Sequence, residues 1–455
     1  MALVDESTRE IIKSEADVFG VNATQTAIEQ SSLQKHYPLT TVDRAGPLEF
    51  KIVSSDDEYI DASTHFLYTK NRILDENGQE LEVTVPPAVD GGQPGTNDDA
   101  IVFPINYFHA TRFKNVEVKI NGKSVTSNDN LYPYRAYLET LLNYESNVKK
   151  EQLALSFFEK DVADFNQCNA DLAREFPRSG SNLGAHARFK RTKNSTTFEC
   201  IGRIHSEIFS QPKLFINGTT ISVKLHPHDQ AFNLMAKNPN KRYTISIDTA
   251  ILFVNHVKIS PSVREAHELA LLKTNAKYPI REIKMKYFTK STGRTDLSEL
   301  NLINGVIPRK IVVGLVSSRA FTGIKSANPF NFHHFNIQNL VLRVNNKAMP
   351  FENIEMDFEN DNVGQGYFVL LHGTNRLYRN KDADLTLADF KNGNTIFAFD
   401  LTPDMSNSHF NLLKEGTVSL EIRLGQPCTE SITIVVYSEY DNVISIDKDR
   451  NVFID

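Results

Sequence analysis

Apolar and polar side chains alternate along many short segments of the chain, with a period of two residues. Such alternation is typical of a β-strand that buries one face and exposes the other. The clearest alternating sets are Leu48, Phe50 and Ile52; Ile221, Val223 and Leu225; Ile283, Met285 and Tyr287; Val418, Leu420, Ile422 and Leu424; and Ile432, Ile434 and Val436. The pattern predicts an all-β fold of antiparallel strands.

Asn-Gly pairs lie between alternating segments at 77–78, 121–122 and 217–218. Asparagine and glycine tolerate the positive φ angles of a type I′ turn, which joins two antiparallel strands through a two-residue loop. The sequence therefore predicts three tight hairpins.

Three segments have helical rather than strand periodicity. "YPYRAYLETLLNY" (132–144) carries Pro133 at a first helical position and an apolar stripe that should pack on a sheet. "EQLALSFFEKDVADF" (151–165) has a looser stripe. "SVREAHELALLK" (262–273) begins with a predicted capping box formed by Ser262 and Glu265. It lies between two β-rich halves, so we interpret it as their connector.

One strand pattern occurs twice. "NYFHATRFKNVEVKINGK" (106–123) matches "NFHHFNIQNLVLRVNNK" (331–347) when Phe108-His109 is aligned with Phe332-His333, and the offset of 224 residues holds through Lys123 and Lys347. The offset is close to half of the 455 residues, so the repeat indicates one fold used twice in tandem. The two histidines are interpreted as structural, each capping a backbone group where a strand starts.

The patterns predict a division of the chain into four parts. Residues 1–40 form an N-terminal arm with the apolar pairs Ile11-Ile12 and Val18-Phe19, and 41–260 form the first β-unit with helical insertions. Residues 261–275 form the connector helix, and 276–455 form the second β-unit. The Pro- and Gly-rich stretch 86–99 is predicted to be a mobile, outward-facing loop.

Composition narrows the function classes. Hydrophobic residues make up 40% and charged residues 23%, as in ordinary globular proteins, and the net charge of −6 argues against a nucleic-acid partner. Neither a signal peptide nor an apolar run near the ~18 residues of a membrane span is evident. Cys168, Cys200 and Cys428 are too few and scattered for a disulfide framework, so we expect an intracellular protein without glycans at Asn22, Asn194 or Asn217.

Several polar clusters were considered as ligand sites. His226, His228 and Asp229 in "HPHD" have zinc-ligand spacing on a strand, but Pro227 favours an edge or turn and no third ligand is evident. Two acidic stretches resemble incomplete calcium loops: Asp447, Asp449 and Asn451, and Asp357, Glu359 and Asp361. Solvated loops are the favoured interpretation for both.

A short basic run contains Arg188, Lys190, Arg191 and Lys193. It is interpreted as a solvated strand face, and contact with an acidic neighbour or DNA stays open. The sequence shows no phosphate loop, nucleophile elbow or zinc-protease helix. We therefore assign no catalytic, cofactor-binding or metal-binding residue and predict that the protein is not an enzyme.

The chain resembles the hexon-like double jelly-roll major capsid proteins of Polinton (Maverick) elements and adintoviruses, and the uncharacterised invertebrate proteins derived from them. The matching segments run in order from 46 to 451 and include "GPLEFKIVSSDDEYIDASTHFLYTK", "NLYPYRAYLETLLNY", "IGRIHSEIF", "VKISPSVREAHELAL", "AKYPIREIKMKYFT", "NPFNFHHFNI", "FAFDLTPDMSNSHFNLLKEGTVSLEIRL" and "VVYSEYDNVISIDKDRN".

The resemblance implies two tandem eight-stranded antiparallel sandwiches per chain and a homotrimer that presents six of them as a pseudo-hexagonal capsomer. It further implies an icosahedral virion capsid in which neighbouring capsomers, pentons and minor or cement proteins are the partners. Synthesis would take place in the host cytoplasm, and membrane contact stays open.

Two other functions were weighed. A minor or penton-type capsid protein usually needs a single jelly roll, and the length and internal repeat argue against it. A two-sandwich carbohydrate-binding protein or hydrolase would be expected to show exposed tryptophans or a facing carboxylate pair, and the chain has no Trp.

Overall fold

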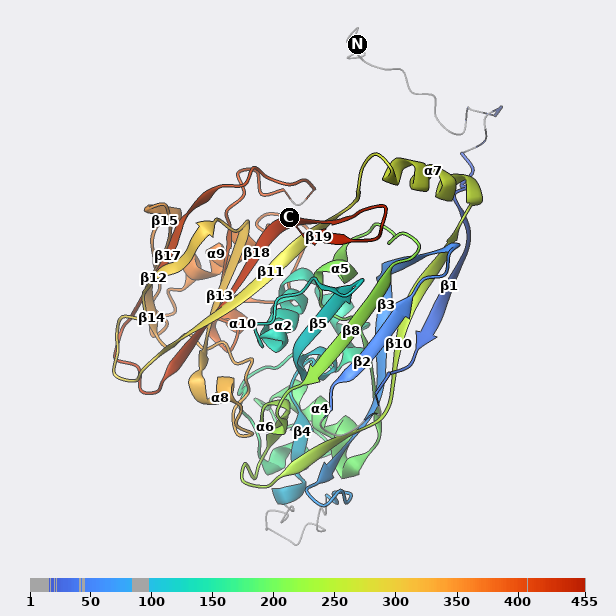
Figure 1. The fold of residues 1–455 in the computed structure, drawn as a ribbon. Coiled ribbons are helices and arrows are strands. Elements are labelled where there is room, and N and C mark those ends of the chain that lie inside the picture. Colours follow the sequence, from blue (N-terminus) through green and yellow to red (C-terminus); the bar gives the residue numbers. More distant parts are fainter. Residues whose placement is uncertain are drawn as a thin grey trace.

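The computed structural model describes residues 16, 18–19, 21, 23–40, 42, 46–83, 98–406 and 408–454. Two β-sandwiches stand side by side in it (Figure 1). The first has one sheet in the order β1 (Ile28–His36), β10 (Tyr243–Ile259), β3 (Glu58–Asp75) and β7 (Phe198–Gly202). Its second sheet has the order β2 (Leu48–Val53), β8 (Thr220–Pro227), β5 (Phe113–Ile120) and β6 (Lys123–Ser124).

The second sandwich repeats this arrangement. One sheet has the order β11 (Ala276–Lys290), β18 (Ile432–Ile446), β13 (Lys310–Ser317) and β16 (Ile396–Asp400), with β19 (Val452–Ile454) added beside β18. The other has the order β12 (Glu299–Val306), β17 (Glu415–Leu424), β14 (Ile337–Val344) and β15 (Lys347–Glu355).

The strand order identifies each sandwich as a jelly roll. If the eight strands of a sandwich are counted along the chain, one sheet contains the first, eighth, third and sixth, and the other the second, seventh, fourth and fifth. All these pairs are antiparallel. A short pair, β4 (Val102–Pro104) and β9 (Leu234–Ala236), lies outside both sandwiches. The predicted double jelly roll is confirmed.

The internal repeat corresponds to equivalent strands. The bounds of β5 and β14 differ by the same offset, since 337 − 113 and 344 − 120 both give 224. Both strands end in a turn with two positive φ angles, 48° and 83° at Asn121-Gly122 and 50° and 64° at Asn345-Asn346. The repeat in the sequence therefore corresponds to the same strand and hairpin turn in each of the two rolls.

The other two predicted hairpins are wrong. Asn77-Gly78 forms a turn after β3, with a hydrogen bond of 3.1 Å from the Gly78 N–H to the Asp75 carbonyl, but residues 79–83 form no strand. Asn217-Gly218 lies in the loop that leads into β8. Only the glycine has positive φ at each of these places, so neither turn is type I′.

Alternation predicted the buried faces of most strands. The apolar residues quoted for β2, β8 and β17 are all buried. In β18 the whole run Ile432–Tyr437 is buried, so both faces of that strand are covered there and burial does not alternate. Tyr287 differs from Ile283 and Met285 because 51% of it is exposed, near the end of β11.

The prediction that residues 1–40 form an arm before the first strand is wrong for residues 28–36. They form β1, the first strand of the first roll, paired with β10 from Ile28↔Ile259 to His36↔Leu252. Most of its side chains are exposed, because β1 is an edge strand held by backbone pairing rather than by burial of an apolar face. The other domain bounds stay predictions. Of the loop predicted at 86–99, only Asp98 and Asp99 are described, in a short 3-10 helix (Asp98–Ala100).

The helices are short and more numerous than expected. They are α1 (Phe108–Thr111), α2 (Tyr132–Asn143), α3 (Ser146–Lys150), α4 (Leu183–Thr192), α5 (Glu207–Ser210), α6 (Gln230–Asn233), α7 (Pro261–Leu271), α8 (Ser318–Thr322), α9 (Gly364–Gly373) and α10 (Leu387–Lys391). Within the described residues, no helix combines the length and apolar character that crossing a membrane requires.

Two of the three predicted helices form. α2 has Pro133 at its second position, and α7 follows β10 as the connector between the rolls. The predicted capping box of α7 is wrong: the N-cap is Ser260, whose side chain accepts no capping hydrogen bond from a helical N–H, and Pro261 is the first helical residue.

The helix predicted at 151–165 is wrong. Only a 3-10 turn (Leu153–Ser156) forms, and Phe157 and Ala163 take left-handed conformations with φ of 60° and 57°, which a right-handed helix excludes. Side chains from elsewhere bind the backbone of this segment instead of helical hydrogen bonds. The Asn106 amide, for example, contacts both the N–H and the carbonyl of Glu159.

Candidate functional site

The seam between the two jelly rolls is built on α2. This helix belongs to the first roll, and Figure 1 shows it near the middle of the molecule between the sandwiches. Tyr137 stacks on Phe330 of the second half with ring centroids 4.2 Å apart and an interplanar angle of 9°. Tyr134 stacks on Phe321 at 5.4 Å and meets Phe332 edge-on at 6.4 Å. Because one continuous apolar core contains residues of both rolls, they form a single unit.

A buried ionic network lies beside these rings. Arg135 of α2 donates to Glu207 at 2.7 Å and to Glu139 at 3.0 Å, and Glu139 also contacts His205 Nδ1 at 2.6 Å. Glu207 accepts the backbone N–H of Ile283, in β11, at 3.3 Å. Burial alone would raise the pKa of Glu139, but the Arg135 charge and the His205 hydrogen bond lower it to about 2.

Polar contacts also join α3 and its neighbours to the loop before α10. Asp382 accepts the N–H and the hydroxyl of Ser146, each at 2.9 Å. Lys149 donates to the carbonyls of Leu141 and Ala383, and burial lowers the pKa of its ammonium to about 7. Lys160 forms ion pairs with Asp384 at 3.3 Å and with Asp389 at 2.9 Å.

The basic run lies on α4 rather than on a strand face, so the solvated-strand interpretation is wrong. Arg188 is fully buried and forms an ion pair with Asp161 at 2.8 Å, and its Nε donates to the Pro104 carbonyl at 3.0 Å. Asp161 in turn accepts the Asn328 amide, from the second half, at 3.1 Å. Arg191 stacks over the Phe157 ring at 3.7 Å. The acidic-neighbour alternative therefore holds for Arg188, within the chain.

The C-terminal acidic loop is closed by its own hydrogen bonds. Asp447 Oδ1 accepts the N–H groups of Asp449 at 2.9 Å and of Asn451 at 2.8 Å. Arg450 binds the Asn217 carbonyl at 2.8 Å and Glu268 of α7 at 2.6 Å, which ties this end of the second roll to the first roll and the connector. The motif that resembles half a calcium loop is thus a structural tie.

This tie predicts that stability depends on Arg450 and not on calcium. Adding Ca²⁺ or a chelator is expected to shift the melting temperature by less than about 1 °C, because Asp447 Oδ1 already accepts N–H groups of its own loop. Arg450→Ala is expected to lower the free energy of unfolding by about 1–3 kcal/mol, because charge-assisted hydrogen bonds are lost. Lys448→Ala is the control, because Lys448 is an exposed neighbour of Arg450, and this change should leave the free energy of unfolding unchanged. A calcium-dependent rise in melting temperature would contradict this assignment.

The remaining metal candidates also have structural partners. His228 stacks on Phe232 with ring centroids 3.9 Å apart, and its Nδ1 accepts the Asp229 N–H at 2.8 Å. Asp357 accepts the Asn360 N–H at 3.1 Å, and Asp361 pairs with Lys391 at 2.6 Å, in an exposed loop as expected. Across the described residues, no three histidine, cysteine or acidic side chains are grouped as metal ligands would be.

The cysteines are free thiols, as expected of residues that only pack. Cys200 and Cys428 are buried and Cys168 is half-buried. Burial raises the pKa of the Cys200 and Cys168 thiols to about 12, which keeps them protonated and unreactive at neutral pH.

The two Phe-His pairs share a position in the chain but not a conformation. Phe108 and Phe332 both have no exposed surface, and each lies five residues before its strand, β5 or β14. His109 is buried in α1, whereas His333 is exposed and its Nδ1 accepts the Phe335 N–H at 2.9 Å. His333 therefore caps a backbone group just before its strand, as predicted, whereas the buried His109 Nδ1 has no hydrogen-bond partner among the described residues, so the two histidines do not share this role.

Acid is expected to destabilise the protein through buried histidines. Burial lowers the pKa of His65 and His109 to about 3. The His65 ring contacts the Ala62 carbonyl and the Ile204 N–H at 2.8 and 2.9 Å, so a neutral ring satisfies both. In the unfolded chain the histidine pKa is about 6.5, so stability is complete above pH 6.5 and falls by up to ~1.4 kcal/mol per pH unit per histidine as the pH drops toward 3.

Chemical denaturation between pH 7 and 4 would measure this slope. His65→Gln is expected to reduce it, whereas the exposed-site control, His409→Gln, should leave it unchanged. Equal slopes in all three proteins would contradict a role for the buried ring.

Comparisons with known proteins agree with the fold. No family model matches the chain. An uncharacterized protein of Caenorhabditis elegans, F54H12.2, is 25% identical over 441 residues, which cover 95% of this chain and 99% of that protein.

Solved structures of viral proteins match nearly the whole chain. A chain of the Sputnik virophage has a TM-score of 0.61 at 12% identity, covering 98% of this chain and 93% of its own. The Faustovirus major capsid protein has a TM-score of 0.54 at 9% identity, covering 96% and 92%. The mavirus major capsid protein has a TM-score of 0.51 at 13% identity, covering 100% and 97%. The chain therefore has the double jelly-roll fold, which it shares with these viral proteins.

Proposed function

We propose that the protein is structural: a hexon-like major capsid protein that trimerises into pseudo-hexagonal capsomers and builds an icosahedral shell. The observation that carries this proposal is the presence, in one chain, of two eight-stranded sandwiches with identical strand order, fixed side by side. Three such chains present six similar sandwiches around one axis, and a six-fold outline tiles a sheet that pentons at five-fold vertices can close into a shell.

The seam supports the proposal because a capsomer needs two sandwiches that keep their relative position. Aromatic stacking through α2, the buried network around Arg135 and the Arg450 tie all connect the rolls. These polar residues are engaged with each other and with backbone groups. We therefore assign them to assembly architecture and propose no catalysis and no cofactor.

The finer assignment is to the Polinton (Maverick) or adintovirus type. It is supported by the segments from 46 to 451 that resemble this family and occur in the same order. It is also supported by the similarity to a nematode protein over nearly the whole length of both chains, since invertebrate proteins derived from these capsid proteins belong to the family. The partners proposed are copies of this chain, neighbouring capsomers, and penton and minor or cement proteins. The proposed location is the virion capsid, after synthesis in the host cytoplasm.

The native protein is expected to be a stable homotrimer, with a mass of about three times the 51.4 kDa chain. The subunit interface should exceed ~2,000 Å², as in obligate assemblies. Light scattering at micromolar concentration measures the mass, and electron microscopy of the same sample should show hexagonal particles. A monomer under these conditions, or a monomer that binds glycans, would contradict the proposal.

A further inference from the structure

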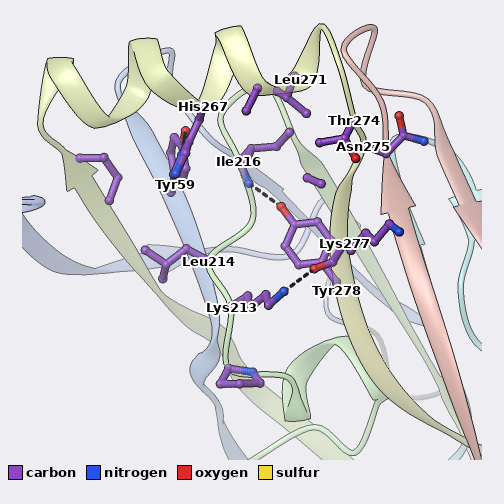
Figure 2. A pocket seen from close by; sticks show the side chains of 14 residues that line it. Tyr59, Lys213, Leu214, Ile216, His267, Leu271, Thr274, Asn275, Lys277 and Tyr278 are labelled. Atoms are coloured by element: carbon purple, nitrogen blue, oxygen red, sulfur yellow. Dashed lines mark hydrogen bonds between the residues drawn. The ribbon is translucent and has the colours of Figure 1, made fainter. Parts of the chain in front are cut away.

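A cavity of about 480 Å³ lies beneath α7, where the connector meets both rolls. Figure 2 shows α7 as its roof, with Leu214 and Ile216 on the side of the first roll and Tyr278 at the start of β11. Ile259, the last residue of β10, and Leu271 of α7 also line it. The volume is in the range of pockets that bind small molecules or peptide anchors, ~300–1,000 Å³.

Four polar side chains of the cavity, those of Tyr59, His267, Tyr278 and Lys213, are hydrogen-bonded within its lining. The Tyr59 hydroxyl contacts His267 Nδ1 at 3.0 Å, and the Tyr278 hydroxyl accepts the Ile216 N–H at 3.2 Å. Lys213 donates to the Lys277 carbonyl at 2.9 Å (Figure 2). The rest of the lining is largely apolar, and it includes two exposed lysines, Lys213 and Lys277. None of the described lining residues is acidic, so an apolar occupant with neighbouring negative charge fits best.

The N-terminal segment has this chemistry. Val18, Phe19 and Val21 are 72%, 98% and 97% exposed, an unusual state for three apolar side chains so close together. Residues 1–21 carry a net side-chain charge of −3, from the acids Asp5, Glu6, Glu10, Glu15 and Asp17 and the bases Arg9 and Lys13. Glu15 and Asp17 directly precede the apolar residues.

The segment is also anchored at the cavity. The Ser260 N–H donates to the Ala27 carbonyl at 2.9 Å, and Ser260 follows the lining residue Ile259. Ala27 is eight positions after Phe19, so a fully extended chain carries Phe19 up to about 26–29 Å from this anchor. The described apolar side chains do not occupy the cavity of their own chain, but they can reach beyond it.

We propose that the cavity beneath α7 receives the Val18-Phe19 segment of a second copy of the chain. Phe19 fills the apolar cavity, and the acids before it lie near Lys213 and Lys277. The contact links neighbouring copies by exchange of N-terminal segments. It deepens the proposed capsid function and rests on it, because it names the surface through which copies associate.

Site-specific disulfide trapping between two full-length chains tests this docking. The donor carries Val21→Cys and the acceptor carries Thr274→Cys, at the mouth of the cavity. Because the two changes are on different chains, a disulfide between positions 21 and 274 in the oxidised mixture, identified by mass spectrometry, can form only between copies. We expect this disulfide to be the main product.

Two further changes test the anchor and the cavity separately. Phe19→Ser in the donor and Ala270→Trp in the acceptor, which places an indole at the lining residue, should each lower the disulfide yield at least about tenfold, as loss of an aromatic anchor does. The matched control is Ala266→Trp, at an exposed position of α7 that does not line the cavity, and it should leave the yield unchanged.

Three outcomes would overturn the inference. The first is that no 21–274 disulfide forms in the mixture. The second is that Ala270→Trp and Ala266→Trp give equal disulfide yields. The third is that the disulfide forms only when both cysteines are in one chain. The last would place the segment in its own cavity. Mass and particle shape of the unaltered chain are measured in parallel. Trimers and shells without the disulfide would contradict only this inference, whereas a monomeric unaltered chain would contradict the proposed function.

Discussion

Phe108→Ala and Phe332→Ala are each expected to lower the free energy of unfolding by a comparable ~3–5 kcal/mol, the usual cost of emptying a buried phenylalanine site. Neither side chain has any exposed surface. Phe108 meets Phe198 edge-on at 5.7 Å in the first roll. Phe332 packs against Gly314 of β13, where a Cβ would come within 2.4 Å of the ring, and against Tyr137 across the seam at 6.3 Å.

Chemical denaturation of both variants measures these losses. Phe176→Ala is the control, because 76% of Phe176 is exposed and its removal should change stability by less than ~0.5 kcal/mol. Equivalent positions in a duplicated fold should lose similar amounts. A loss at one site several times larger than at the other would count against their equivalence.

Arg188→Met is expected to lower the free energy of unfolding by about 3–5 kcal/mol, because it leaves the Asp161 carboxylate buried without its cation. Both side chains have no exposed surface, and their ion pair is 2.8 Å long. The loss should also loosen the seam, since the same carboxylate accepts the Asn328 amide from the second half. Methionine keeps most of the side-chain volume, so the electrostatic loss dominates over the loss of contacts.

Lys190→Met is the matched control for this variant. Lys190 lies on the same helix two residues away and is exposed, so its replacement should change the free energy of unfolding by less than ~0.5 kcal/mol. If the two variants are equally stable, the buried pair contributes no net stability, and the seam depends on its other contacts.

Local sequence patterns predict only part of the candidate site. The aromatic residues of α2 could be predicted to pack, since their spacing places them on one helical stripe. Their partners could not, because Tyr137 and Phe330 are almost two hundred residues apart and no local pattern relates them. The burial of Arg188 could not be predicted for the same reason: a basic run is normally solvated, and only Asp161, brought near by the fold, makes burial of the guanidinium tolerable.

The sequence by itself determined the all-β class, the duplication and the main buried faces. Strand alternation is a local property, and the turn at Asn121-Gly122 forms because strands β5 and β6 on both sides of it pair, whereas the segments on both sides of the other two Asn-Gly pairs do not pair with each other. Tertiary structure decided the rest. β1 is a strand because β10 offers it a free edge, although its own side chains are mostly polar and exposed. Residues 151–165 are not helical because distant side chains, such as Asn106, hold their backbone groups. In each case the deciding partner lies far away in the sequence, and its energy exceeds the small preference that a local segment has for one conformation.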